Sequence, residues 1–412
     1  MRPLIDAALS AIQDAIGVAI PEVYLPYLFV GLALAVVGAI VTFAAVYAGL
    51  FIYFERRIGA RMMSRIGPNR VGPHGLLQWL ADALKLIMKE DIIPTAADGT
   101  LFRIAPYLMA IGVMSGFAVL PFSHRFVGTN LNIGVLYVLG VTSISVVGIL
   151  MSGWASNSKW ALFGGMRSAA QIVSYEIPTA MAILPAVLLA GTMSTQGIIH
   201  AQGGEPWNWF IFHSPMMFVL FFVYFIAGLA EGSRTPFDLP EAESELVSGY
   251  NTEYSGFRFA AYFLAEFANT WILAAVGVIV FLGGWQIPFV SSDVLAQAQG
   301  TQALLWELAS AGVFVLKTLA LVFLTIQLRW TLPRIRVDQM MVVCWKFLVP
   351  IVFACTFLML GWMLFIPWES TAGLVVRIVM TLMGTGLVLA YLNRVRYNVK
   401  ASKRKVDLNF AV

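Results

Sequence analysis

The residues best suited to chemistry lie in one acidic segment, 231–256, which reads EGSRTPFDLPEAESELVSGYNTEYSG. Charged residues make up only 12% of the chain, which has 22 acids in all. This segment nevertheless combines a single base, Arg234, with the acids Glu231, Asp238, Glu241, Glu243, Glu245 and Glu253. Repulsion between close carboxylates favours protonation of some of them near neutral pH. The segment therefore predicts a site of proton uptake and release.

Further ionisable residues lie inside apolar runs, where charge is costly. Glu176 and Glu266 are several residues inside two such runs, Lys317 is near the middle of another, and Glu307 is at a run end. A charge at the bilayer centre costs about 3 kcal/mol, so such residues commonly mark ion paths or proton relays. The alternative is a structural ion pair of Glu176 or Glu266 with Lys317.

Helix capping explains only part of the acidic segment. Asp238 and Glu241 have the spacing of a capping box, and acids near a helix N-terminus complement the helix dipole. The other four acids of the segment have no such explanation.

Redox centres and nucleotide sites are not predicted in this chain. Cys344 and Cys355 are too few for an iron–sulfur cluster, which needs four ligands. The four histidines are also too few: His74 is in a loop, and three others are at or beyond the ends of apolar runs, namely His124, His200 and His213. Neither GxGxxG nor a Walker A motif occurs. We expect no flavin, haem, iron–sulfur cluster or metal site here, so a partner must supply any electrons.

Composition predicts an all-α polytopic membrane protein, a single integral membrane domain over 1–412. The chain is 59% hydrophobic, with a mean hydropathy of +0.82, whereas soluble domains rarely exceed half apolar. About 20 apolar residues span a bilayer. The nine expected spans are 25–53, 104–122, 131–153, 169–191, 212–230, 257–284, 305–328, 343–365 and 371–392.

Basic residues predict the orientation. Loops after the odd-numbered spans, with the span ends, hold all of the 26 basic residues except Arg2, Arg125, Lys317 and Arg377. The positive-inside rule then makes this side cytoplasmic, with the N-terminus outside and the basic tail inside. The net charge of +4 thus reflects topology, and no nucleic-acid partner is expected. The predicted cytoplasmic loops are 54–103, 154–168, 231–256 and 329–342. Their charge density fits either a docked partner or a solvated face.

The first of these loops contains an amphipathic helix, GLLQWLADALKLIMKED. Leu80, Leu84 and Ile87 share one helical face, while Asp82 and Lys85 are on the other. This helix is too short and too charged to span, so we expect it to lie on the membrane surface. It could be an interfacial anchor or one wall of a site that opens to the lipid.

Four long motifs carry a family resemblance: FERRIGARMMSRIGPNRVGP, GLLQWLADALKLIMKED, SGWASNSKWALFGGMRSAAQIVSYE and AEGSRTPFDLPEAESELVSGYNTEYSG. They closely resemble the quinone-site membrane subunit of respiratory complex I, which is the H subunit of bacteria and the equivalent of mitochondrial subunit 1. The resemblance extends from about residue 50 to 285, and more loosely to about 365.

This resemblance implies a subunit of a proton-translocating NADH:quinone oxidoreductase in the bacterial cytoplasmic membrane. Its substrate would be ubiquinone or menaquinone, reduced by electrons from an iron–sulfur subunit of the hydrophilic arm. Its partners would be that arm, the other membrane subunits and the lipid bilayer. None of its own residues would be redox-active.

The resemblance also assigns residue roles. Arg56 would line the quinone entrance, Ala81 and Asp82 lie in the helix beside it, and Arg234 and Asp238 are near the quinone chamber. The acidic proton path would comprise Glu176, Glu231, Glu241, Glu243, Glu245, Glu253 and Glu266. Two departures, Arg70 and Pro240, remove no carboxylate. The extra C-terminal helix and basic tail, 366–412, inherit no role and would be a membrane anchor or a docking extension.

Other functions are compatible with the sequence. A related complex fed by ferredoxin or another donor would use the same subunit. A standalone cation transporter would also contain buried acids, although no inverted repeat supports it. A pure scaffold would tolerate neutralisation of the acidic segment.

Overall fold

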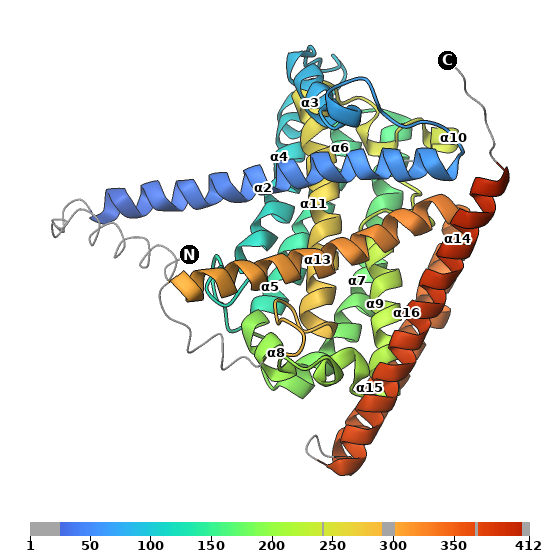
Figure 1. Ribbon diagram of the computed structural model, residues 1–412. Helices are drawn as coiled ribbons and strands as arrows, with labels where there is room; N and C mark the ends of the chain where they lie inside the picture. The colour runs from blue at the N-terminus through green and yellow to red at the C-terminus, as the bar shows by residue number, and fades with distance from the viewer. Residues whose placement is uncertain (1–24, 241–242, 291–300, 367–369, 406–412) are drawn as a thin grey trace.

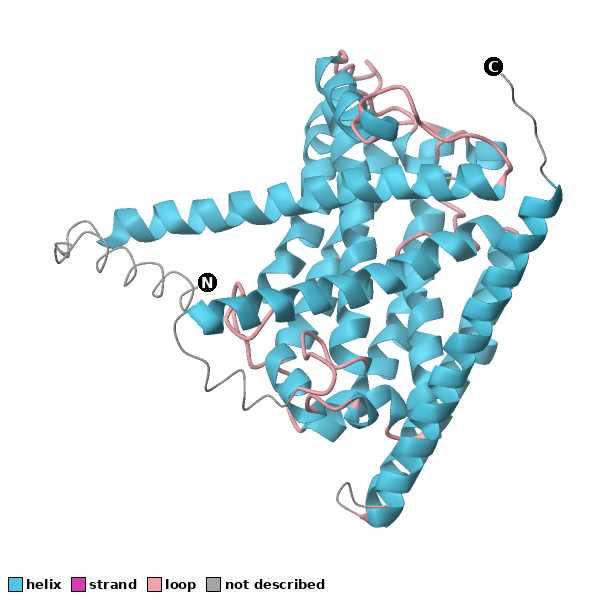
Figure 2. Cartoon of the chain, in the orientation of Figure 1, coloured by secondary structure: helices cyan, strands magenta, loops and turns pink. Residues whose placement is uncertain are grey.

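A computed structural model describes residues 25–240, 243–290, 301–366 and 370–405 of the chain. These described residues form helices joined by loops and contain no β-strand (Figure 2). A helix satisfies its backbone hydrogen bonds internally, which a lipid environment requires. The predicted all-α membrane fold is confirmed.

The predicted spans correspond to apolar helices. In the described residues, eight helices or runs of consecutive helices are long and apolar enough to cross a membrane. Helix α9, with 17 residues, is a shorter apolar helix at the fifth expected span. In chain order they are α2 (Leu25–Met62), α4 (Gly99–Gly116) with η3 (Phe117–Val119), α5 (Gly134–Thr142) with α6 (Ile144–Ala155), α7 (Lys159–Ala190), α9 (Pro215–Glu231), α11 (Gly256–Phe281), α13 (Thr301–Thr331), α14 (Val337–Val342) with η7 (Val343–Leu348) and α15 (Val349–Phe365), and α16 (Thr371–Lys405).

Short helices occupy the connections between these spans. They are η2 (Pro73–Gly75), α3 (Gln78–Met88), α8 (Thr195–Gln202), η4 (Pro206–Asn208), η5 (Phe210–Phe212), α10 (Glu243–Leu246) and η6 (Gly249–Asn251). Helices α3 and α10 lie at the top of Figure 1, and we call that end of the bundle the basic side. Helix α8 lies at the opposite side.

Two helices cross the bundle at a steep angle. Figure 1 shows α4, α6, α7, α9 and α11 running roughly side by side, with α2 and α13 lying obliquely across them. Helix α2 has 38 residues. Its length of roughly 57 Å greatly exceeds a hydrocarbon core of about 30 Å, so α2 must either tilt or extend beyond the lipid.

Three predicted loops overlap with helices. Helix α2 continues to Met62, α7 begins at Lys159, and α13 ends at Thr331. Residues at the edges of the predicted loops 54–103, 154–168 and 329–342 are therefore helical. The reason is that hydropathy marks where a chain leaves lipid, whereas Arg and Lys are good helix formers and extend a helix beyond that point.

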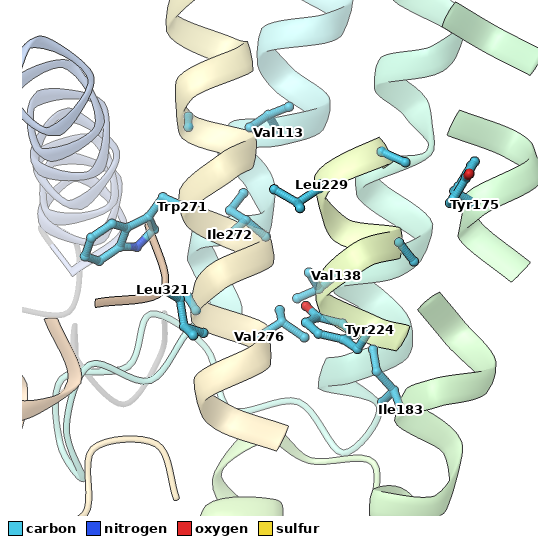
Figure 3. Close-up of a cluster of buried hydrophobic side chains, with 14 of the residues drawn as sticks. Val113, Val138, Tyr175, Ile183, Tyr224, Leu229, Trp271, Ile272, Val276 and Leu321 are labelled. Carbon is cyan, nitrogen blue, oxygen red and sulfur yellow. The ribbon is translucent and has the colours of Figure 1, made fainter. Parts of the chain in front are cut away.

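Helix α11 forms the centre of the core. Its apolar window is 72% buried, more than that of any other candidate span in the described residues. Figure 3 shows Trp271, Ile272 and Val276 of α11 amid side chains from the surrounding helices. The neighbours labelled there are Val113, Val138, Tyr175, Ile183, Tyr224, Leu229 and Leu321. Packing on several sides fixes α11 relative to the helices that carry the candidate site.

The predicted amphipathic helix is α3. It has no fully buried residue, and its apolar side chains Leu80, Leu84 and Ile87 are exposed. Asp82 and Trp79 are only partly exposed. A short helix with an uncovered apolar face suits the membrane surface, as the sequence predicted.

Candidate functional site

The principal cavity has a volume of about 540 Å³ and lies between α2, α3, α11 and α13. Apolar and aromatic side chains dominate its wall, among them Ile52, Trp79, Phe259, Phe263 and Trp330. A largely apolar cavity of this size suits a small, mostly apolar ligand.

Two glycines of α2 make room for the indole rings of Trp79 and Trp330, which line this cavity. A Cβ atom at Gly49 would overlap the ring of Trp79, and one at Gly59 would overlap the ring of Trp330. The absence of a side chain at these two positions therefore lets α3 and α13 approach α2. A larger residue at either position would displace a wall of the cavity.

Ion pairs form the polar part of the cavity wall. Arg56 Nη1 contacts Asp82 Oδ2 at 2.7 Å, Lys85 Nζ lies 3.4 Å from Asp82 Oδ1, and Arg329 pairs with Glu55. Partial burial acts to raise the pKa of Asp82, but the hydrogen bond and charge of Arg56 outweigh it and lower that pKa. Asp82 is therefore ionised at neutral pH. Of the residues predicted for the quinone site, Arg56 and Asp82 line this cavity, whereas Ala81 does not.

Arg234 lies directly behind the cavity wall. Its side chain is 3% exposed, its Nη2 atom lies 3.2 Å from Glu266 Oε1, and its Nε donates to Thr270 Oγ1. The guanidinium carbon is 4.5 Å from the centre of the Phe267 ring and 5.3 Å from that of Phe51. Because Phe267 also lines the cavity, one ring separates this buried ion pair from the cavity.

Asp238 joins the same electrostatic network. Its Oδ2 atom lies 3.2 Å from Arg334 Nη2, and its charge interacts with that of Glu266. The predicted cap stays a prediction, because residues 241–242, which include Glu241, lie outside the described residues. We use the name arginine-paired cluster for Glu55–Arg329, Arg234–Glu266 and Asp238–Arg334.

Glu176 and Glu231 form a second cluster of a different kind, the unpaired pair. Glu176 is on α7, Glu231 is the last residue of α9, and the two charges interact. The hydroxyls of Ser143 and Thr179 interact with Glu176 and Glu231, respectively. Within the described ranges neither carboxylate forms an ion pair, and each has one buried oxygen without a hydrogen-bond partner.

The helix around Glu176 lacks one of its backbone hydrogen bonds. Pro178 lacks the N–H that would bond to the carbonyl of Ser174, and that carbonyl instead accepts a hydrogen bond from Cys344 Sγ at 3.2 Å. Cys344 belongs to η7, a π-helical turn, and the nearby Met340 carbonyl accepts a bond from Tyr175. Side chains thus replace backbone hydrogen bonds beside Glu176, as π turns near functional sites often allow.

The other predicted acids do not gather at one point. Glu245 is exposed and pairs with Arg167 at 2.7 Å, and Glu253 is partly exposed in the loop after η6. Glu243 begins α10. Glu241 and the side chain of Glu243 lie outside the described residues.

Lys317 has a structural role. Its ammonium donates to three backbone carbonyls that follow α11, those of Leu282, Gly284 and Gln286, at 2.8–3.0 Å. The ring of Trp209 lies 4.1 Å from the same nitrogen. The alternative of an ion pair between Lys317 and Glu176 or Glu266 is therefore wrong. Glu307, on the same helix α13, accepts a hydrogen bond from Ser123 and pairs with Arg125.

Comparison with known proteins places these features in a family. The model of the NADH dehydrogenase family matches residues 34–360. The chain belongs to this family. It is similar to the H subunit of the NADH-quinone oxidoreductase of Anaeromyxobacter dehalogenans, at 50% identity over 382 residues, which cover 91% of this chain and 92% of the relative. The corresponding H subunit of Chlorobium luteolum is 49% identical over 82% of this chain and 91% of its own length. That of Chlorobaculum tepidum is 50% identical over 77% of this chain and 89% of its own length.

The family match confirms the resemblance identified from the four motifs. The cavity, the arginine-paired cluster and the unpaired pair all lie within residues 34–360. Helix α16 lies beyond this range. Its buried Arg377 donates to Asn208 Oδ1 at 2.8 Å, which fixes α16 to η4.

Sequence reasoning missed three members of the site. Glu55, Arg329 and Arg334 carry ion pairs of the arginine-paired cluster, and the first two line the cavity. Glu55 immediately precedes Arg56, so its position in the FERR motif was the available signal. No group of three or more His, Cys, Asp or Glu residues gathers for metal binding in the part of the chain that the structure describes.

Proposed function

We propose that this chain is the quinone-binding membrane subunit of an NADH:quinone oxidoreductase and that it links quinone reduction to proton translocation. The observation that carries the proposal is the cavity of about 540 Å³ between α2, α3, α11 and α13. The names of the relatives support the class of complex, since each is the H subunit of an NADH-quinone oxidoreductase.

The cavity suits a quinone because it combines two environments. Its aromatic and aliphatic wall fits an isoprenoid tail, and its charged residues Arg56 and Arg329 can donate hydrogen bonds to quinone carbonyls. The exposed apolar face of α3 would rest in the lipid surface beside it. A quinone dissolved in the bilayer could therefore enter sideways, past α2 and α3.

Electrons would come from a partner subunit. The basic side of the bundle would face the cytoplasm, with the N-terminus outside, and would dock the hydrophilic arm that holds the iron–sulfur clusters. NADH would be the donor to the whole complex, in line with the relatives' names. Ubiquinone and menaquinone both fit a cavity of this description.

The coupling step would begin with the charge change at the quinone. Two electrons give the quinone two negative charges until two protons are taken up to form the neutral quinol, and this transient charge would perturb the arginine-paired cluster in and behind the cavity wall. Glu266 interacts with Asp238, Glu55 and Arg329, so a change at the cavity would be felt across the cluster. The unpaired pair, free of a fixed cationic partner, would then bind or release a proton.

A pair of variants on α3 tests the quinone site. Ala83 lines the cavity, whereas Ala81, two residues away and also partly exposed, does not. In the assembled complex, Ala83→Trp should lower kcat/KM for quinone at least about tenfold, or about 1.4 kcal/mol, because the indole fills the cavity. Ala81→Trp is the matched control, for which less than about a twofold change is expected. Electron transfer from NADH to an artificial acceptor should be unchanged in both.

Two results would contradict the proposal. Equal quinone kinetics in Ala83→Trp and the wild-type complex would exclude this cavity as the quinone site. Purified chain that transports cations in vesicles without quinone or partner subunits would instead identify a standalone transporter.

A further inference from the structure

Two histidines meet on the side of the bundle opposite the basic side. His124 follows α4, His200 is on α8, and both side chains are exposed. Their ring centres are 5.4 Å apart, and both rings pack edge-on against Trp285, which is 1% exposed. Nothing in the proposed quinone reaction uses these residues.

We propose that His124 and His200 form a two-histidine binding site for a divalent transition metal ion such as Zn²⁺ or Cu²⁺. Imidazole nitrogen is a preferred ligand of both ions. The sequence predicted no metal site, because its few histidines are scattered. The fold brings together two that are far apart in the sequence, and the proposal revises that prediction.

The ring separation fits shared coordination. A zinc–imidazole bond is about 2.0–2.1 Å long, so two imidazoles on one tetrahedral ion have ring centres roughly 5 Å apart. The observed 5.4 Å requires only a small closing movement. Rotation of two exposed rings about their side-chain bonds can supply it, and water would complete the coordination shell.

Hydrogen bonds hold the backbone of both histidines. The carbonyl of His124 accepts from Gln196 Nε2 at 2.9 Å, and Gln196 is one turn before His200 on α8. Gln286 Nε2 donates to the carbonyl of Ile199 at 2.7 Å, which ties the turn carrying Trp285 to the same helix. The segments that carry the two ligands are therefore linked before any ion binds, which reduces the entropy cost of binding.

The surroundings of the pair permit metal binding. An ordinary imidazole is mostly neutral at pH 7 and can then act as a ligand. The nearest positive residue in sequence, Arg125, is paired with Glu307. Lys317 donates to the carbonyls of Gly284 and Gln286, the residues on either side of Trp285. The presence of only two protein ligands predicts moderate affinity.

Copper titration of the full-length chain, purified in detergent without a polyhistidine tag, tests the site. Wild-type protein should bind one Cu²⁺ with an electron paramagnetic resonance spectrum split by two nitrogen nuclei. His124→Gln and His200→Gln should each weaken binding at least about tenfold and abolish the two-nitrogen splitting. His74→Gln, which changes an exposed histidine near the basic side, is the matched control and should bind as the wild type does.

A second measurement keeps the test independent of folding. Zn²⁺ should raise the midpoint of thermal unfolding of the wild type and of His74→Gln, since the ion would connect the loop after α4 to α8. It should leave the midpoints of the other two variants unchanged, while all four proteins unfold at similar temperatures without metal. Copper binding that survives both His124→Gln and His200→Gln, or a single-nitrogen spectrum in the wild type, would overturn the proposal. Neither readout depends on quinone, so failure here leaves the proposed function intact.

Discussion

The arginine-paired cluster and the unpaired pair both bury carboxylates, yet they surround them differently. Glu266 faces the guanidinium of Arg234 at 3.2 Å, and Glu55 and Asp238 pair with Arg329 and Arg334. In the described part of the chain, Glu176 and Glu231 have hydroxyl neighbours and each other, but no cation.

This difference suggests that the two clusters have different functions. A guanidinium is always charged, so it attracts the negative charge of a carboxylate beside it. Two carboxylates that share a site without a cation repel each other when both are ionised, so ionisation of the second one is unfavourable. The arginine-paired cluster would therefore sense charge at the cavity, and the unpaired pair would exchange protons.

The largest effect should follow removal of a guanidinium. Arg234→Met leaves the buried Glu266 without its partner, which should destabilise the chain by about 3–5 kcal/mol, measured by denaturant unfolding of the purified protein. Arg167→Met, which breaks the exposed pair with Glu245, is the control and should cost about 1 kcal/mol or less. The double variant Arg234→Met/Glu266→Gln should regain much of the loss. If Arg234→Met were as stable as the wild type, the ion pair with Glu266 would not distinguish the arginine-paired cluster from the unpaired pair.

Proton transfer is the next test. Glu231→Gln should lower proton translocation coupled to quinone reduction at least about tenfold in vesicles containing the complex, because an amide cannot bind and release a proton. Glu176→Gln should act in the same way, while electron transfer to artificial acceptors continues. The exposed, paired Glu245→Gln serves as the control. If pumping and quinone turnover were normal in both variants, the unpaired pair would have no part in coupling.

A smaller effect is expected at the cavity wall. Glu55→Gln removes the partner of Arg329, so we expect the KM for quinone to change by about three- to tenfold, with a smaller change in kcat. Asp91→Asn breaks the pair with Arg258, and neither residue lines the cavity. An identical KM in Glu55→Gln and Asp91→Asn would separate the arginine-paired cluster from quinone binding.

The smallest effect concerns the surface pair Arg56–Asp82. The folded-state pKa of Asp82 is lowered from its ordinary 3.8, so its stabilisation is fully present above pH 3.8 and is lost as pH falls through the folded value. Solvent screening limits the contribution to about 1 kcal/mol or less. The unfolding midpoint of Asp82→Asn should lie slightly below that of the wild type at pH 7, and the gap should close below about pH 4. If the difference between the two unfolding midpoints grew as the pH fell, the pKa of Asp82 would be raised by folding and not lowered.

The sequence predicted the helices well and the ion pairs poorly. Apolar runs located each span, because hydropathy reports burial in lipid directly. The division of the acids could not be predicted, since Glu55 and Arg329 are 274 residues apart. Lys317 illustrates the same limit: the cost of a buried charge indicated a partner, but its partners are backbone carbonyls exposed by the turn after α11.

Helix α16 brings the described chain back toward the basic side of the bundle. Figure 1 shows α15 descending away from the basic side and α16 returning toward it, held at its start by Arg377 and Asn208. A protein shortened to residue 366 would thus end on the opposite face of the membrane from the full-length one. Reporter domains fused after residue 366 and after residue 405 should therefore be accessible from different compartments.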